Sequence, residues 1–232
     1  MKNILLIGGS YGIGLSIAKA LANDNNVFVA SRTAEGLSDL NVTHLTFDAQ
    51  TDTLDISKLP AVIDGLVYCP GSINLRPFKG LKIETFESDL QINFLDMVKV
   101  VQTVLPQLTA SNQSSIVLFS SVAASMGMPF HTSVAAAKGA IEGFAKALAA
   151  EYAPKIRVNV IAPSLTNTPL ADKFLNNETK QEKSAERHPL KRFGQPDDLA
   201  QMATFLLSEK SSWMSGQILH VDGGMSTLLV NS

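Results

Sequence analysis

The chain is poor in cysteine, in net charge and in long apolar runs. Its one cysteine, Cys69, cannot form an internal disulfide, and no Cys/His cluster has the spacing of a zinc site. The formal net charge of -2 over 232 residues gives no electrostatic basis for binding nucleic acid or acidic lipid. No apolar stretch approaches the roughly 18 residues that cross a bilayer, and the run Ile4 to Ile7 is too short for a signal-peptide core. We therefore expect a cytoplasmic protein without a metal, nucleic-acid or membrane partner.

Short apolar runs do alternate with longer amphipathic stretches. NILLIGG (3–9) and IRVNVIAP (156–163) are typical of strands buried on both faces, whereas LSIAKALAND (15–24) has helical spacing. Residues 86–108 predict one long helix. No linker or repeat divides the chain, so we expect one α/β domain over residues 1–232. Its fold class is a Rossmann-type doubly wound parallel sheet of about seven strands with helices on both faces.

A polar stretch at 171–192 follows the strand 156–163. It is either a solvated face or a segment that covers a substrate, because ligands of α/β sheets bind at the carboxyl ends of the strands.

Three glycines, Gly8, Gly12 and Gly14, lie between the first predicted strand and the first predicted helix. Glycine permits a tight turn there and lets backbone N–H groups approach a pyrophosphate at the helix N-terminus. The spacing Gly-x-x-x-Gly-x-Gly, placed between a strand and a helix, predicts a dinucleotide site.

The end of the second strand indicates which dinucleotide binds. A carboxylate there would bind the ribose 2′-hydroxyl of NAD, but this chain has Ser31 and Arg32 and no acid before Glu35. Arginine offers a permanently charged donor fork for phosphate, so the sequence favours NADP over NAD. Asp48 ends the third strand and could accept a hydrogen bond from the adenine amino group.

Together with later segments, these residues resemble the short-chain dehydrogenase/reductase family over residues 4 to about 224. The glycines match the family pattern TGxxxGIG, with Ile7 replacing threonine. QIN (91–93), VLFSSVAA (117–124) and VNVIAPSLTNTPL (158–170) match later family segments, with Ser164 in place of a glycine, and YCPG (68–71) stands for NNAG. Residues 192–224 are similar to the C-terminal pattern of 3-oxoacyl carrier-protein reductases.

The resemblance implies a catalytic group made of Asn93, Ser121 and Lys138. It also implies a tetramer or dimer built through residues 85–108 and 134–152, and a small-molecule or acyl-thioester substrate. The cofactor contacts that it implies are Gly8, Ser10, Tyr11, Gly12, Ile13, Gly14, Ser31, Arg32, Asp48, Ala49, Pro70, Gly71, Lys138, Pro163, Leu165 and Thr168.

One catalytic position departs from the family. Reduction of a carbonyl needs an acid to protonate the developing alkoxide, and in the family a tyrosine four residues before the lysine supplies it. Here Val134 occupies that position, and valine cannot donate a proton.

Three interpretations stay open. His131 could replace the tyrosine, since it lies seven residues before Lys138, the Tyr-x6-Lys spacing of related enoyl reductases, and 131, 134 and 138 would share one helix face. The reaction could instead be reduction of a conjugated enoyl thioester, as in the 2,4-dienoyl-CoA reductases, which lack the same tyrosine. The third interpretation is an NADP-binding sensor or non-catalytic subunit. His188 and His220 are interpreted as surface or core-edge histidines.

Overall fold

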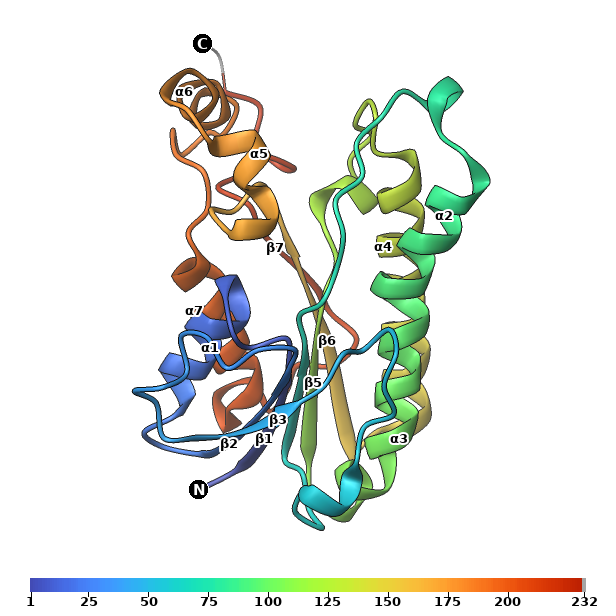
Figure 1. Ribbon diagram of the computed structural model, residues 1–232, viewed down its shortest axis with the longest axis vertical. Coiled ribbons are helices and arrows are strands. Elements are labelled where there is room, and N and C mark those ends of the chain that lie inside the picture. Colours follow the sequence, from blue (N-terminus) through green and yellow to red (C-terminus); the bar gives the residue numbers. More distant parts are fainter. Residues whose placement is uncertain (231–232) are drawn as a thin grey trace.

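Seven parallel strands form the predicted sheet in a computed structural model that describes residues 1–230 (Figure 1). The order of the strands is β3-β2-β1-β4-β5-β6-β7. Because the order reverses between β1 and β4, the loops after these two strands diverge and leave a crevice at the carboxyl edge, where such sheets bind ligands. The strands are β1 (Asn3–Ile7), β2 (Asn26–Ser31), β3 (Val42–Thr46), β4 (Gly65–Tyr68), β5 (Ser114–Phe119), β6 (Ile156–Pro163) and β7 (Ile218–Val221).

Helices cover both faces of the sheet. In Figure 1, α1 and α7 lie on one side, and α2, α3 and α4 lie on the other. The short helices α5 and α6 sit beyond the carboxyl edge, at the top of that view. The helices are α1 (Gly12–Leu21), α2 (Ile83–Leu90), α3 (Asp96–Ala110), α4 (Thr132–Tyr152), α5 (Asp172–Leu175), α6 (Glu178–Glu186) and α7 (Pro196–Leu207).

Two apolar cores follow from the alternation of side chains along each strand. Leu5 of β1 points into the core under α3 and α4, whereas Leu6 points into the core under α1 and α7. The central strands of the sheet are therefore buried on both faces and apolar at most positions, with polar residues near the amino ends of β5 and β6. Over residues 1–230, no helix combines the length and the apolar character needed to cross a membrane.

The predicted continuous helix over 86–108 is interrupted. A π-helical turn, η3 (Gln91–Leu95), separates α2 from α3, so the single α-helix expected from the sequence is wrong at this point. Such turns insert a residue into the helical repeat and frequently occur at functional sites. Here the turn contains Asn93, whose side chain is fully buried.

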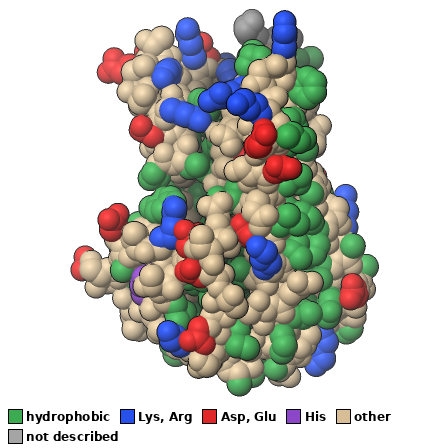
Figure 2. Space-filling view, turned by 45° about the vertical axis from the view of Figure 1, so that its right-hand side comes forward, with side chains coloured by type: hydrophobic (Ala, Val, Ile, Leu, Met, Phe, Trp, Pro, Cys, Tyr) green, Lys and Arg blue, Asp and Glu red, His purple; other side chains and the backbone are tan. Residues whose placement is uncertain are grey.

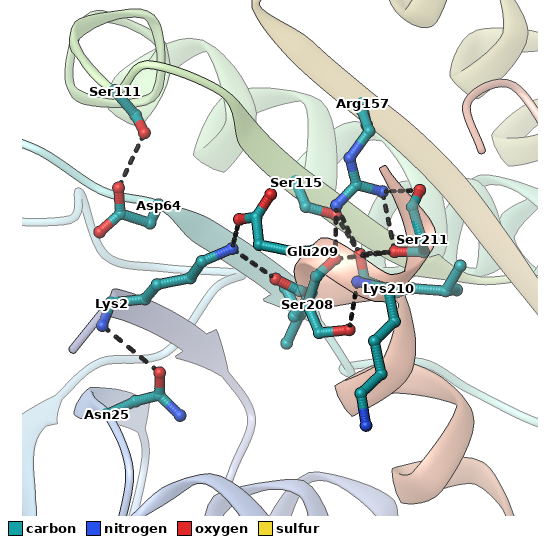
Figure 3. Close-up of polar contacts among 12 residues, drawn as sticks. Lys2, Asn25, Asp64, Ser111, Ser115, Arg157, Ser208, Glu209, Lys210 and Ser211 are labelled. Atoms are coloured by element: carbon teal, nitrogen blue, oxygen red, sulfur yellow. Dashed lines mark hydrogen bonds and ion pairs between the residues drawn. The ribbon is translucent and has the colours of Figure 1, made fainter. Parts of the chain in front are cut away.

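A buried arginine secures the opposite, amino-terminal edge of the sheet (Figure 3). Arg157 of β6 donates to the carbonyl oxygens of Leu206 at 2.9 Å and Ser208 at 3.3 Å through Nη2, and of Ser211 at 3.0 Å through Nη1. Lys2 donates to the Leu207 carbonyl oxygen at 3.1 Å. Two cations therefore cover the carbonyl groups that the end of α7 leaves without helical partners, where the helix dipole also favours positive charge.

Candidate functional site

A cavity of about 450 Å³ opens at the carboxyl edge of the sheet, within the usual range for small-molecule sites. It lies where the loops after β4, β5 and β6 meet the start of α4 and the segment 171–192. Ser121, His131 and Lys138, three of the four predicted catalytic residues, line it, and so does Val134. The fourth, Asn93, is buried behind its wall.

Lys138 of α4 extends its side chain toward the end of β5. Its Nζ donates to the carbonyl oxygen of Phe119 at 2.9 Å, which uses one of its three donors. Burial lowers the pKa of Lys138 to about 8, with nearby Cys69 and Asp89 opposing that shift. The same burial raises the pKa of the Cys69 thiol to about 12, so Cys69 lines the cavity as an unreactive thiol.

Asn93 is held by a buried polar network that the sequence did not reveal. Its Nδ2 donates to the carbonyl oxygen of Asp89 at 2.8 Å and to Ser72 Oγ at 2.8 Å. The Asp89 carboxylate, also fully buried, accepts hydrogen bonds from the Ser72 hydroxyl, from Asn74 Nδ2 and from the Ser133 hydroxyl. Asp89 therefore ties the π-helical turn to the loop after β4 and to the first turn of α4.

Gly71 brings that network up to the lysine. A Cβ at this position would lie 2.9 Å from Asn93 Oδ1 and 3.3 Å from Lys138 Nζ. The absence of a side chain at Gly71 lets the asparagine and the lysine face the same small space. The signal for Asp89 in the sequence was its place four residues before Asn93, one helical turn away.

The two consecutive serines after β5 have different partners. Ser120 Oγ donates to Glu142 Oε1 at 2.6 Å, on the side of α4. Ser121 Oγ only accepts, from the backbone N–H of Ala123 at 3.2 Å. The Ser121 hydroxyl proton is thus free to be donated into the cavity, whereas that of Ser120 is already bonded to Glu142.

His131 is not part of the helix. The helix α4 begins at Thr132, and His131 precedes it with φ of -104° and ψ of 8°. The expectation that residues 131, 134 and 138 share one helix face is therefore wrong, because residue 131 lies before the helix. All three residues nevertheless line the cavity. His131 Nδ1 donates to the carbonyl oxygen of Pro129 at 2.7 Å, which leaves Nε2 without a protein partner among the described residues.

The glycine-rich turn between β1 and α1 fits a dinucleotide pyrophosphate. Gly12 has φ of +58°, a left-handed conformation that favours glycine, and a Cβ on Gly14 would lie 2.1 Å from the carbonyl oxygen of Gly8. The N-terminus of α1 has no side-chain cap and no acidic residue in its first turn. Its backbone N–H groups are therefore open to an anion.

The predicted cofactor residues lie at this edge of the sheet, in the glycine-rich turn, in α4 and at the ends of the other strands. They divide into two groups by their position relative to the cavity. Ile13, Gly71, Lys138, Pro163, Leu165 and Thr168 line it. The first turn of α1, the end of β2 and the loops after β1, β2, β3 and β4 hold those outside its lining: Gly8, Ser10, Tyr11, Gly12, Gly14, Ser31, Arg32, Asp48, Ala49 and Pro70.

Arg32 and Tyr11 meet at the outer end of this edge. Arg32 Nη2 donates to Tyr11 Oη at 3.2 Å, and both side chains are exposed. Asp48 Oδ1 accepts from the Gln50 backbone N–H at 3.0 Å, as an ordinary turn aspartate does, and its second oxygen stays available.

The segment 171–192 supplies one wall of the cavity and much of its charge. Lys173, Lys180, Lys183 and Arg187 of this segment line it, in addition to Lys138, and no Asp or Glu does. Figure 2 shows Lys and Arg side chains, with some Asp and Glu among them, near the top of the molecule. Lys173 Nζ donates to the carbonyl oxygen of Ile73 at 2.8 Å, which bridges this wall to the loop after β4.

His188 and Ser164 also line the cavity, and sequence reasoning did not select them. His188 follows α6 and is only 2% exposed. It joins the covering segment to Ser164, the residue directly after β6, through a hydrogen bond of 2.9 Å. His188 is thus a core-edge residue, as expected, whereas His220 is exposed and contacts Ser125 Oγ at 3.0 Å outside the cavity.

Comparison with known proteins agrees with this architecture. Residues 8–226 match the family model described as enoyl-(acyl carrier protein) reductase. The chain is 31% identical to a 3-oxoacyl-(acyl-carrier-protein) reductase of Thermotoga maritima and 33% identical to one of Chlamydia trachomatis, with 97% of each chain covered in both cases.

Solved structures extend the similarity to the fold. A short chain dehydrogenase family protein from Francisella tularensis superposes with a TM-score of 0.89 at 27% identity, covering 98% of this chain and 100% of that one. The protein ElxO with NADP bound gives a TM-score of 0.89 at 26% identity, with the same coverage. The chain belongs to the short-chain dehydrogenase/reductase family of NAD(P)-dependent oxidoreductases.

Proposed function

We propose that this protein is an NADP(H)-dependent reductase that acts on a carbonyl or a conjugated enoyl group. The observation that carries the proposal is the convergence of Ser121 and Lys138 on one cavity, with Asn93 directly behind them. The glycine-rich turn beside the cavity fits the cofactor. Retention of the asparagine network favours an active enzyme over a protein that only binds the dinucleotide, because cofactor binding alone would not require it.

The cofactor supplies a hydride when bound, and the protein supplies the rest. Lys138, with two unused donors, would hold the ribose hydroxyls, and the backbone at the start of α1 would hold the pyrophosphate. Ser121 would donate its free hydroxyl proton in a hydrogen bond to the substrate oxygen. Asn93 holds the π-helical turn and the loop after β4 in register with Lys138. Val134 leaves the proton itself to another group, and His131 is one of the candidates that the sequence leaves open.

The lining of the cavity favours an anionic substrate. Five basic side chains and no carboxylate surround it, and within residues 1–230 neither Lys183 nor Arg187 forms an ion pair. Unpaired cations in a concave site attract and orient negative groups. The carrier-protein reductases among the relatives suggest an acyl thioester, whose carrier arm ends in a phosphate; a small keto acid has the same charge.

A substrate panel tests the function. We expect NADPH oxidation with β-ketoacyl or enoyl thioesters of coenzyme A or with keto acids, and slower turnover of the matched uncharged thioesters of N-acetylcysteamine. Replacing Lys183 and Arg187 together with alanine should raise KM for the anionic substrates about tenfold and leave the uncharged ones unchanged, since about 1.4 kcal/mol of binding would be lost. Absorbance at the NADPH band gives both constants. Tight NADPH binding without any turnover would instead favour the sensor or non-catalytic subunit.

Two variants test whether another residue has replaced the family's general acid or whether the protein has lost it. If the protein has lost its general acid, Val134→Tyr should raise kcat by about 10²–10⁴-fold, because it restores the family's donor four residues before Lys138. If another group already donates, Val134→Tyr should change kcat little. His131→Ala with wild-type kcat would exclude His131 as the donor.

Arg32 should set the cofactor preference. We expect Arg32→Asp to weaken NADPH binding by about 10²-fold and to favour NADH, because a carboxylate repels the 2′-phosphate and accepts from a 2′-hydroxyl. Lys155→Asp makes the same charge change at the opposite edge of the sheet and is the matched control. Cofactor fluorescence titrations give both affinities. An unchanged preference would remove Arg32 from the cofactor site.

We also propose a homo-oligomer assembled through α2, α3 and α4. Figure 2 shows hydrophobic side chains spread over the face that these helices form. Sedimentation of the purified protein measures the oligomeric state directly.

A further inference from the structure

A buried histidine and a serine share the cavity with the proposed catalytic group. His188 Nε2 lies 2.9 Å from Ser164 Oγ, and His188 Nδ1 lies 2.6 Å from the carbonyl oxygen of Ser184. Since a carbonyl oxygen can only accept, the proton on the Ser184 side belongs to Nδ1. The second ring nitrogen, Nε2, therefore faces the serine in every protonation state.

This arrangement is compatible with both charge states of the ring. In the neutral ring, Nε2 accepts a hydrogen bond from the Ser164 hydroxyl. In the imidazolium, Nε2–H donates to Ser164 Oγ, and the serine's own proton is then free to point elsewhere. Both hydrogen bonds of His188 persist while a proton moves, so a transfer needs no rearrangement of a side chain that is 2% exposed.

The serine lies beside the proposed reaction centre. In the sheet, Phe119 of β5 pairs with Ile161 of β6. Ser121 comes two residues after the first, and Ser164 comes three residues after the second. Their hydroxyls therefore emerge from adjacent strand ends, and both line the cavity that Val134 leaves without an acid.

We propose that Ser164 and His188 form a proton relay to the substrate oxygen, in the role that the family tyrosine has elsewhere. The inference rests on the proposed function and names its acid. As the substrate carbon gains the hydride that a reduced nicotinamide supplies, the π pair of the carbonyl becomes a lone pair on oxygen. The Ser164 O–H bond breaks, and its proton passes to that oxygen. The Nε2–H proton of His188 passes to Ser164 Oγ at the same time. His188 ends neutral and regains a proton from water.

The relay is tested by removing proton transfer and keeping the hydrogen bond. His188→Gln can still bond to Ser164 but cannot shuttle a proton, and Ser164→Ala removes the intermediate hydroxyl. We expect each change to lower kcat by about 10²–10³-fold, and the double variant to lose no more, because the two residues act as one unit. Ser164→Thr, which keeps the hydroxyl, should retain most of the wild-type kcat.

His220→Gln is the matched control. Its ring contacts Ser125 Oγ at 3.0 Å outside the cavity, so the same chemical change should leave kcat unaltered. Two measurements do not depend on turnover. The NADPH dissociation constant should stay within about two-fold in all variants. Nitrogen NMR of the neutral His188 ring should show the proton on Nδ1, and the Nε2 signal should move in Ser164→Ala.

Other outcomes would overturn the relay. Unchanged kcat with raised KM and faster hydrogen exchange in α6 would make the pair a structural latch for the covering segment. A neutral ring protonated on Nε2, or a loss of kcat in His131→Gln alone, would also contradict it. In each of these cases, turnover of substrate by the wild-type protein would still support the proposed reductase function. A wild type that reduces no substrate would refute the reductase and the relay together.

Discussion

Replacing Lys138 with methionine is expected to lower kcat by about 10³-fold while making the apo-protein more stable. The loss of rate follows from removing the ammonium that faces Asn93, Gly71 and the cavity. The gain in stability follows from burial: the fold lowers the pKa of Lys138 from 10.5 to about 8, so it disfavours the charged form. A shift of that size corresponds to about 3 kcal/mol, and methionine has a similar length without the charge.

The stability difference between Lys138→Met and the wild type should depend on pH. At pH 7 the lysine is charged in both states, so the folded protein bears the whole cost of the buried ammonium. Between pH 8 and 10.5 the folded state releases its proton while the unfolded chain keeps it, and the wild type gains stability as the pH rises. The advantage of Lys138→Met, about 2–3 kcal/mol at pH 7, should therefore shrink toward pH 10.5.

Denaturant unfolding of the apo-protein at pH 7 and pH 9.5, alongside steady-state kinetics, measures both effects. Lys210→Met is the control, because the Lys210 side chain is exposed and Figure 3 shows no hydrogen bond or ion pair at its ammonium group. Lys210→Met should leave kcat unchanged and alter the free energy of unfolding by no more than about 0.5 kcal/mol. A Lys138→Met protein that is less stable than the wild type at pH 7 would show that the ammonium is well compensated inside the fold.

The fold and the cofactor edge were predictable because their causes are local. The mostly apolar runs of β1 and β6 require burial on both faces, and the spacing of Gly8, Gly12 and Gly14 reflects a turn with little room for side chains. Such constraints act within a few residues of each other along the chain. They can therefore be read without knowing which segments meet in space.

The elements that escaped prediction depend on contacts between distant segments. Ser164 and His188 are 24 residues apart, and nothing in their local sequence says that α6 folds back over the end of β6. The network of Asp89 joins three separate elements in the same way. The π-helical turn at Asn93 has no periodic signal either, because a single inserted residue leaves the pattern of α2 and α3 intact on each side.

The buried Arg157 is another such case, and its removal should have the largest effect on stability. We expect Arg157→Met to lower the free energy of unfolding by about 3–5 kcal/mol. The guanidinium donates charge-assisted hydrogen bonds to carbonyl oxygens at the end of α7 and in the following turn, and without it these oxygens keep only the weaker neutral donors of Ser115, Ser211 and the Met214 N–H. Burial lowers the pKa of Arg157, yet arginine stays charged, so its charge continues to oppose the negative end of the α7 dipole.

Lys155→Met is the matched control, two residues earlier and exposed, with an expected change of about 0.5 kcal/mol or less. Arg157→Lys should recover only part of the loss, because one ammonium cannot reach Leu206, Ser208 and Ser211 as the planar fork does.

Hydrogen exchange adds a local readout, since amides at the carboxyl end of α7 should lose protection first. A loss below about 1 kcal/mol would mean that Ser115 and Ser211, which also donate to the Leu206 carbonyl, hold this edge without the arginine. The amino-terminal edge would then depend on neutral hydrogen bonds, and the charge of Arg157 would be dispensable to the fold.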